Sequence, residues 1–146
     1  MDDTIARIEA EVAMLLRLAD RNRRTGDALE GTLDRSAYLL LGRLADGAAN
    51  VNALARQLCL DPSTVTRQVL AMEADALVRR SRDPQDGRAT LVTATDRGRA
   101  ALAGTRAARA ALYSSMLADW PPDDRTVMAK LLARLNADLD ARARRP

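Results

Sequence analysis

Residues 54–73 read LARQLCLDPSTVTRQVLAME, and the Asp-Pro pair near their centre divides an otherwise helical segment into two short helices. Proline lacks a backbone N–H, so it interrupts a helix unless it lies in the first turn. Asp61 suits the N-cap, because its carboxylate can accept hydrogen bonds from N–H groups two or three residues further on, and Pro62 then occupies the first helical position. We therefore expect a helix over 53–58, a tight turn over 59–61 and a second helix from Pro62.

The helix that begins at Pro62 has an apolar and a polar face. Val65, Val69, Met72 and Ala76 recur at steps of four, three and four residues, which places them on one stripe. Successive residues of a helix are turned by about 100°, so the side chains that point away from this stripe are ones that can form hydrogen bonds. They are Ser63, Thr66 and Arg67, with Thr64 and Gln68 at the flanks. We expect the apolar stripe to pack inward and the polar face to point outward.

A β-hairpin is predicted next. The runs LVRRSR at 77–82 and ATLVTA at 89–94 tolerate strand structure, and the connection DPQDGR at 83–88 contains the Asp, Pro and Gly residues that turns use. Thr95 can cap the following helix, with Asp96 in its first turn, where the helix dipole favours an anion. The pattern therefore indicates two strands followed by a long helix.

Amphipathic helices flank this central segment. Apolar residues repeat at three- and four-residue steps over about 3–23 and over 35–45, along the alanine-rich stretch after the hairpin, and along a last helix after Pro121–Pro122. Asn52 is the expected N-cap of the short helix before the Asp-Pro turn. With 47% hydrophobic but only 2% aromatic residues and no Phe, the core must use aliphatic side chains, which suits helices.

Several classes of protein are disfavoured. With no His and one Cys, the chain lacks a His-based catalytic triad, a His or multi-Cys zinc site and an intrachain disulfide. No paired carboxylates, and no nucleophile beside a base, stand out near a Gly-rich loop, so we expect neither an enzyme nor a cofactor. The start lacks a basic segment followed by an apolar run, and no 18 consecutive apolar residues occur, so we expect a cytoplasmic protein that does not bind membranes.

The net charge of +3 is modest, but nearly every cation is Arg, with Lys130 the only Lys. The planar guanidinium can donate two hydrogen bonds at once to a phosphate or a guanine edge. A biased genome composition would produce the same excess, so the arginine content alone does not identify a nucleic-acid-binding protein.

The order of the parts is more informative. A helix, a short helix, a tight turn, a polar-faced helix and a hairpin form the winged helix-turn-helix arrangement, in which the polar-faced helix enters the DNA major groove. We expect a mainly α single domain over 1–146, with a winged helix-turn-helix lobe over 35–98 and a helical dimerisation region formed by 1–25 and 99–146. The terminal helices carry apolar stripes that one small lobe cannot cover, which favours a homodimer.

Nine residues are candidate DNA contacts. They are Ser63, Thr64, Thr66, Arg67 and Gln68 on the helix, and Arg82, Asp86, Gly87 and Arg88 on the hairpin. Arg67 is the first choice for a base contact, while Ser63 and Thr64 suit a phosphate at the helix start. Arg88 follows the turn and can reach a narrow minor groove, with Asp86 holding its guanidinium. The alternative is that these charges belong to a solvated hairpin.

Two segments resemble the MarR family of bacterial transcription regulators, and the resemblance covers essentially the whole chain. LARQLCLDPSTVTRQV is similar to the family's helix-turn-helix, and LVRRSRDPQDGRATLVTATDRGR is similar to its wing, with the pattern Asp-x-Arg then Thr-x-x-Gly at Asp86, Arg88, Thr95 and Gly98. Ala76 and Ala94 depart from the family's usual Gly and its usual Leu or Ile. The resemblance implies a homodimer with interlocked terminal helices that binds a palindromic operator in double-stranded DNA.

The resemblance also implies a ligand-responsive repressor, because many relatives release DNA when a small, often aromatic, anion binds. We assign no ligand-binding residue, since Met14, Arg17 and Tyr38 at helical spacing are more typical of a core. Cys59 is expected to be a buried structural cysteine and not a redox sensor. The main alternative function is a helical protein-protein interaction module without DNA binding, which predicts no salt-sensitive affinity for DNA.

Overall fold

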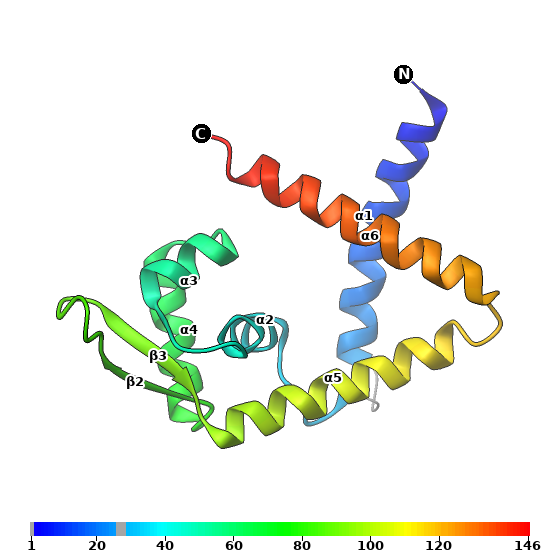
Figure 1. The fold of residues 1–146 in the computed structure, drawn as a ribbon. Helices are drawn as coiled ribbons and strands as arrows, with labels where there is room; N and C mark the ends of the chain where they lie inside the picture. Colours follow the sequence, from blue (N-terminus) through cyan, green and yellow to red (C-terminus); the bar gives the residue numbers. More distant parts are fainter. Residues whose placement is uncertain (1, 26–28) are drawn as a thin grey trace. The chain divides into compact units, whose positions relative to one another are not determined.

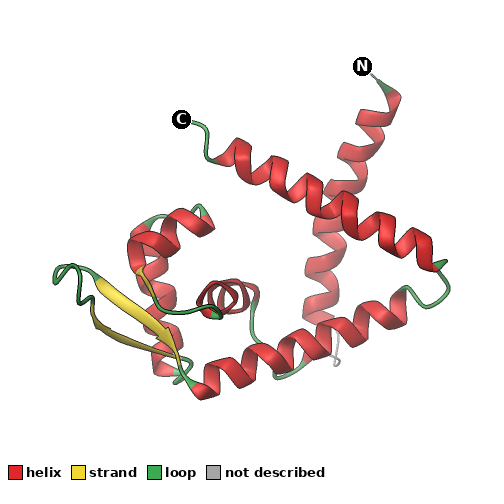
Figure 2. Cartoon of the chain, in the orientation of Figure 1, coloured by secondary structure: helices red, strands yellow, loops and turns green. Residues whose placement is uncertain are grey.

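The computed structural model describes residues 2–25 and 29–146, and the chain divides into two compact units, Met1–Gly31 and Thr32–Pro146, which we describe separately. Helices dominate, and the strands lie in the second unit (Figure 2). The prediction of a mainly α fold is confirmed. No helix within the two described ranges is long and apolar enough to cross a membrane.

The first unit contains one long helix, α1 (Asp3–Thr25), close to the predicted range of 3–23. The Asp2 carboxylate accepts a hydrogen bond from the backbone N–H of Thr4 at 3.0 Å near the start of this helix. Its predicted break at Thr25–Gly26 extends beyond the described residues. Large apolar side chains of α1 are exposed. They are Ile5, Ile8, Met14, Leu15, Leu16 and Leu18.

The second unit holds five helices and three strands (Figure 1). They are α2 (Arg35–Leu44), β1 (Ala49–Asn50), α3 (Val51–Leu58), α4 (Pro62–Ala74), β2 (Val78–Arg82), β3 (Thr90–Ala94), α5 (Asp96–Met116) and α6 (Pro122–Ala143). The pair α3–α4 and the hairpin β2–β3 match the expected helix-turn-helix and wing. The predicted winged helix-turn-helix is therefore confirmed.

The sheet has one strand more than the sequence predicts. Its order is β1-β3-β2, both pairs are antiparallel, and Ala49 and Asn50 lie opposite Val92 and Leu91. A two-residue strand is too short to show an alternating pattern. The same segment corrects the predicted cap of α3: Asn50, and not Asn52, accepts a hydrogen bond from the Ala53 N–H, at 2.7 Å.

The core of the second unit consists of aliphatic side chains from α2, α3, α4, the sheet and α5. The large side chains with essentially no exposed surface are Leu40, Leu41, Leu54, Val65, Val69 and Val92. Thr105 is the buried polar residue among the described ones, and its hydroxyl accepts a hydrogen bond from the Leu33 N–H at 3.0 Å. The predicted inward stripe of α4 is confirmed at Val65, Val69 and Met72, whereas Ala76 lies beyond the end of the helix and is exposed.

Ala76 has a left-handed backbone, with φ of 60°. This conformation brings a Cβ atom close to the backbone and costs a non-glycine residue about 1 kcal/mol. The left-handed backbone at residue 76 therefore explains why the family that this sequence resembles usually has glycine there.

Ala76→Gly is expected to raise the free energy of unfolding by about 1 kcal/mol, because glycine adopts the left-handed backbone without strain. Thermal or urea denaturation followed by circular dichroism measures the change. Ala74→Gly, inside the last turn of α4, is the matched control and is expected to destabilise the protein. Destabilisation by both substitutions would contradict the strain at Ala76.

The other departure from the family pattern leaves space in the lobe. Ala94 is 7% exposed and lines a cavity of about 190 Å³ together with Leu41, Ala45 and Leu102. A Leu or Ile side chain at this position would occupy part of that volume. The small residue therefore reduces the packing between β3, α2 and α5.

Candidate nucleic-acid interface

The polar face of α4 points outward as predicted. Ser63, Thr66 and Arg67 are exposed, Thr64 and Gln68 are half-buried at its edges, and Val65 and Val69 on the opposite side have no exposed surface. The packing of α3 against α4 within the lobe fixes this orientation (Figure 1). A helix held this way presents hydroxyl and guanidinium groups to whatever approaches the lobe.

The first turn of α4 differs from the prediction in one respect. Asp61 has the extended backbone of an N-cap and Pro62 follows it, but the Asp61 carboxylate accepts no capping hydrogen bond. The capping therefore depends on backbone conformation and not on the side chain. Since the carboxylate does not occupy the N–H groups of Ser63 and Thr64, the helix start suits an anion.

Hydrogen bonds orient the side chains along this face. The guanidinium of Arg67 donates to the Thr64 hydroxyl at 3.4 Å, and the Thr66 hydroxyl donates to the carbonyl of Pro62 at 2.9 Å. Gln68 differs, because its side-chain oxygen is buried and has no hydrogen-bond partner among the described residues. The guanidinium of Arg67 thus remains the outward group best able to bind a base edge.

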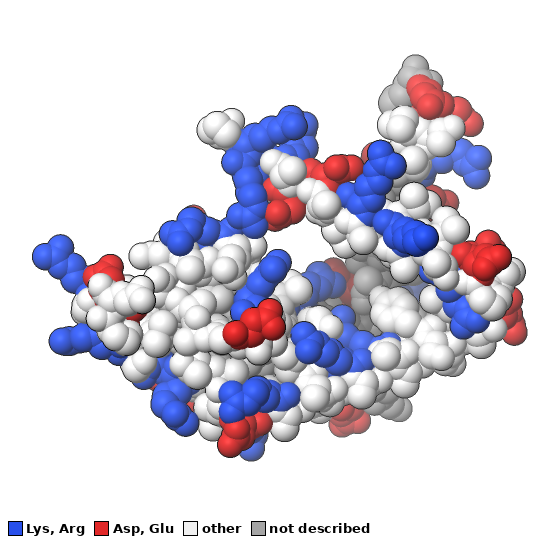
Figure 3. Space-filling model, viewed as in Figure 1, with Lys and Arg blue, Asp and Glu red and all other residues white. Residues whose placement is uncertain are grey.

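The predicted wing residues are all exposed in the hairpin. They are Arg82, Asp86, Gly87 and Arg88. Asp86 does not hold the Arg88 guanidinium as expected, because its carboxylate accepts the backbone N–H of Arg88, at 3.1 Å, as in an Asx turn. A Cβ at Gly87 would lie 3.7 Å from Arg82 Cδ, an ordinary contact, so the turn does not require glycine for space. Arginine side chains project from the end of the molecule that holds the wing (Figure 3).

An ion pair that was not predicted joins α4 to the wing. Arg80 Nη2 lies 2.9 Å from Glu73 Oε1, and the hydrogen bonds of Arg80 hold the pKa of the Glu73 carboxyl below its usual 4.5. The same contact raises the pKa of the Arg80 guanidinium. Opposite charges on both sides of the turn at 75–77 are the signal that could have indicated it.

Comparison with known proteins identifies the family to which this fold belongs. The MarR family model matches residues 35–90. An uncharacterized HTH-type transcriptional regulator of Bacillus subtilis, YxaD, is 41% identical over 107 residues, which cover 73% of this chain and 75% of that protein. The chain belongs to the MarR family. It is therefore a DNA-binding transcriptional regulator and not an enzyme, as expected from the sequence, which disfavours the protein-binding module.

Two solved structures support the MarR assignment. A probable transcriptional regulator from Pseudomonas aeruginosa has a TM-score of 0.71 and 28% identity, and the match covers 88% of this chain and 98% of that one. BpsR of Bordetella bronchiseptica has a TM-score of 0.67 and 26% identity, covering 86% and 92%. Both matches cover most of the length of each chain.

Cys59 of this MarR-family chain is exposed, which contradicts the predicted buried cysteine. It lies just beyond the end of α3 with a left-handed backbone, φ 54°, and its thiol lies 3.8 Å from Asp140 Oδ1. The prediction rested on the general tendency of free cysteines to be buried. No group of three or more potential His, Cys, Asp or Glu metal ligands occurs among the described residues.

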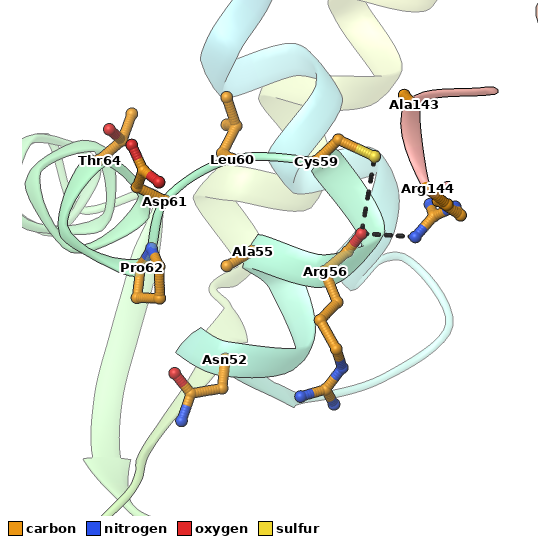
Figure 4. Close-up of a pocket in the computed structure, with 10 residues that line it drawn as sticks. All are labelled: Asn52, Ala55, Arg56, Cys59, Leu60, Asp61, Pro62, Thr64, Ala143 and Arg144. Carbon is orange, nitrogen blue, oxygen red and sulfur yellow. Dashed lines mark hydrogen bonds between the residues drawn. The ribbon is translucent and has the colours of Figure 1, made fainter. Parts of the chain in front are cut away.

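The turn between α3 and α4 lines an open groove of about 790 Å³ (Figure 4). The Arg144 guanidinium donates to the carbonyls of Arg56 at 2.7 Å and Gln57 at 3.0 Å, at the end of α3. Arg144 also pairs with Asp140 at 2.8 Å and thereby lowers the pKa of that carboxyl. In this MarR-family chain, a side chain from the C-terminal end therefore caps the first helix of the helix-turn-helix, which the sequence did not indicate.

Proposed function

We propose that this MarR-family regulator binds a palindromic operator as a homodimer and represses transcription until a small molecule releases it. The observation that carries the proposal is the orientation of α4, with Val65, Val69 and Met72 inside and Arg67 outside. A helix of this kind can enter the major groove with its polar face toward the bases. Because a bacterial repressor binds chromosomal DNA, which lies in the cytoplasm, the proposal includes a cytoplasmic location.

The proposed contacts fall into two groups. Ser63, Thr64 and Thr66 bind the phosphate backbone near the start of α4, and Arg67 binds a base edge. Gln68 contributes less, because its oxygen is buried. From the wing, Arg82 and Arg88 supply charge to the minor groove, while Asp86 and Gly87 shape the turn.

The dimer is supported by apolar side chains that one chain leaves exposed. On α1 they include Ile5, Leu15 and Leu16, and on α6 they include Leu131 and Leu139, each about half exposed or more. Pairing of two chains would remove this surface from water. Light scattering at micromolar concentration is expected to give the mass of a dimer, and two lobes would meet half-sites roughly 34 Å, about 10 base pairs, apart.

The ligand response is supported by a relative and by a cavity. DNA binding by BpsR of Bordetella bronchiseptica is regulated by 6-hydroxynicotinic acid. In this chain a cavity of about 480 Å³ lies between the segment before and at the start of α2 and the inner side of α4, where Gln68 and Met72 line it. A ligand in this cavity would contact the DNA-binding helix directly. Hydroxylated aromatic acids are the first compounds to test for release of DNA.

The decisive experiment sequences the genomic DNA fragments that the purified protein retains. A repeated inverted motif is expected, and its half-site spacing reports the dimer geometry. Retention of no fragments, or binding that does not depend on salt, would support a protein-binding module and contradict the proposal.

Arg88→Ala is expected to weaken binding to the retained DNA and to flatten the dependence of log K on log salt by about one unit, because one phosphate or groove contact is lost. Fluorescence anisotropy at several salt concentrations measures both quantities. Arg97→Ala, an exposed arginine on α5, is the matched control for charge. An unchanged slope for Arg88→Ala would argue against a wing contact.

A further inference from the structure

The ion pair between Glu73 and Arg80 has more contacts than a simple surface pair. Arg80 Nη2 donates to Glu73 Oε1 at 2.9 Å, and Arg80 Nε lies 3.1 Å from each carboxylate oxygen. The backbone N–H of Arg80 also donates to Glu73 Oε2, at 3.2 Å. The carboxylate therefore holds the strand backbone as well as the side chain, which restricts the position of β2 itself.

These contacts join the two parts of the lobe proposed to bind DNA. Glu73 lies in the last turn of α4, and Arg80 is the central residue of β2, opposite Val92 of β3. Only the short turn at 75–77 connects α4 to β2 along the chain. A restraint at Arg80 passes through the β2–β3 ladder to the tip of the wing, where Arg88 lies.

A second contact supports the wing where β2 leads into the hairpin turn. The Asn50 side chain, which caps α3 through its oxygen, donates through its nitrogen to Asp83 Oδ2 at 3.5 Å. The other oxygen of Asp83 accepts the backbone N–H of Gln85 at 2.9 Å at the start of the turn. The wing is thus connected to both helices of the helix-turn-helix, by a weak contact at α3 and by a strong one at α4.

We propose that Glu73 is a positioning residue for DNA recognition, which fixes the angle between α4 and the wing so that Arg67 and Arg88 reach their grooves together. The inference rests on the proposed use of α4 and the wing to bind DNA. Glu73 itself does not touch DNA. It acts through Arg80, whose guanidinium is engaged in the pair and is not counted among the DNA contacts.

If Glu73 acted only through its charge, its removal would have the opposite effect on DNA affinity from the removal of a positioning residue. A carboxylate on a DNA-binding lobe repels phosphates, so its removal would strengthen DNA binding or leave it unchanged. If Glu73 positions the wing, its removal weakens binding even though the protein becomes more positive. The sign of the change therefore separates a positioning role from a plain surface charge.

Glu73 and Arg80 are both charged at neutral pH, so the pair is intact when DNA binding is measured there. Because Arg80 lowers the pKa of Glu73 below 4.5, the carboxylate stays charged at all pH values above that, and the contact is lost only as the pH falls through the lowered pKa. The chain also contains no His to titrate near neutrality. Binding measured between about pH 6 and pH 8 therefore reports the intact pair.

The test compares Glu73→Gln with the wild-type protein on a fluorescent duplex carrying a retained sequence. Glutamine keeps the shape of the side chain but removes its charge. We expect affinity to fall about three- to thirtyfold, the range for residues that act on a site without contacting it. The melting temperature is expected to stay nearly constant, because the pair is partly exposed. Asp96→Asn, which removes the carboxylate from the exposed Arg99–Asp96 pair on α5, is the control for charge and is not expected to weaken binding.

A double-mutant cycle gives the second measurement. If Glu73 holds the wing, Arg88→Ala costs much less affinity in the Glu73→Gln background than in the wild-type protein, although the two residues are not in contact. Suppose that Arg88→Ala weakens DNA binding by the wild-type protein. Unchanged or tighter binding by Glu73→Gln, or an equal cost of Arg88→Ala in both backgrounds, then overturns the role of Glu73 and leaves the proposed function standing. No effect of Arg88→Ala in the wild-type protein overturns the wing contact of the proposed function and this inference together.

Discussion

Gly98→Ala is expected to lower the free energy of unfolding by about 3 kcal/mol or more, enough to leave much of the lobe unfolded at moderate temperature. A Cβ at this position would lie 2.0 Å from the carbonyl oxygen of Leu77 and 3.2 Å from Leu41 Cδ2. The first of these contacts is with backbone, so no side-chain rotation can relieve it. The helix would have to move away from the turn before β2.

Hydrogen bonds around Gly98 oppose that movement. The Thr95 hydroxyl accepts the Gly98 N–H at 2.9 Å and donates to the Ala76 carbonyl at 2.7 Å, while the Thr95 N–H donates to the Leu77 carbonyl at 3.1 Å. The start of α5 is therefore fastened to the turn between α4 and β2. A larger residue at Gly98 breaks these bonds or compresses the core, and both are costly.

Gly42→Ala is the matched control for Gly98→Ala. Gly42 also lies inside a helix, but the nearest atom to its added Cβ is Arg106 Nη2, at 4.0 Å, on a flexible side chain. Alanine favours helix by up to about 1 kcal/mol over glycine, so this variant is expected to be as stable as the wild-type protein or more so. Urea denaturation followed by circular dichroism compares the two. Similar changes in stability for Gly98→Ala and Gly42→Ala would show that the close approach to Leu77 is not the reason for glycine at position 98.

The same geometry explains part of the family pattern. Thr-x-x-Gly at 95–98 provides one cap and one close approach, and both act on the turn at 75–77. Ala76 within this turn is strained, and its carbonyl accepts the Thr95 hydroxyl. The usual glycine at this position would relieve the strain without changing the hydrogen bond.

Features that depend on neighbouring residues were predicted well from the sequence. The Asp-Pro pair located the start of α4, and the spacing of Val65, Val69 and Met72 gave its buried side. Thr95 was correctly identified as the cap of α5. These signals are local, because a helix period or a cap needs only a few consecutive residues.

Features that depend on distant residues, and the backbone conformation at Cys59, were not predicted. The choice of Asn50 over Asn52 as a cap follows from where β1 ends, which is set by its pairing with β3. Cys59 has a left-handed backbone at the end of α3 and is exposed, and neither property follows from the residue types around it. The opposite charges of Glu73 and Arg80 are visible in the sequence, but whether they meet depends on the angle between a helix and a strand, which the sequence pattern does not give.

Arg67→Ala is expected to weaken binding to the operator by about five- to 150-fold, the effect of losing a two-bond contact with guanine, and to weaken binding to unrelated DNA far less. The guanidinium is exposed on the outer face of α4, and its one hydrogen bond among the described residues is the long 3.4 Å contact with Thr64. The side chain can therefore exchange that contact for a base edge at little cost. Competition anisotropy with a retained duplex and a scrambled duplex measures both affinities.

Arg67→Lys separates the two contributions of this arginine. Lysine keeps the charge that attracts any phosphate backbone but lacks the planar fork that donates two parallel hydrogen bonds. If Arg67 binds a base, Arg67→Lys retains most of the affinity for scrambled DNA and loses most of the preference for the operator. If Arg67 binds only phosphate, lysine restores both affinities, and Arg67→Ala weakens both duplexes equally. That second result would be compatible with the orientation of α4, but it would mean that other residues on the outer face of α4 recognise the bases.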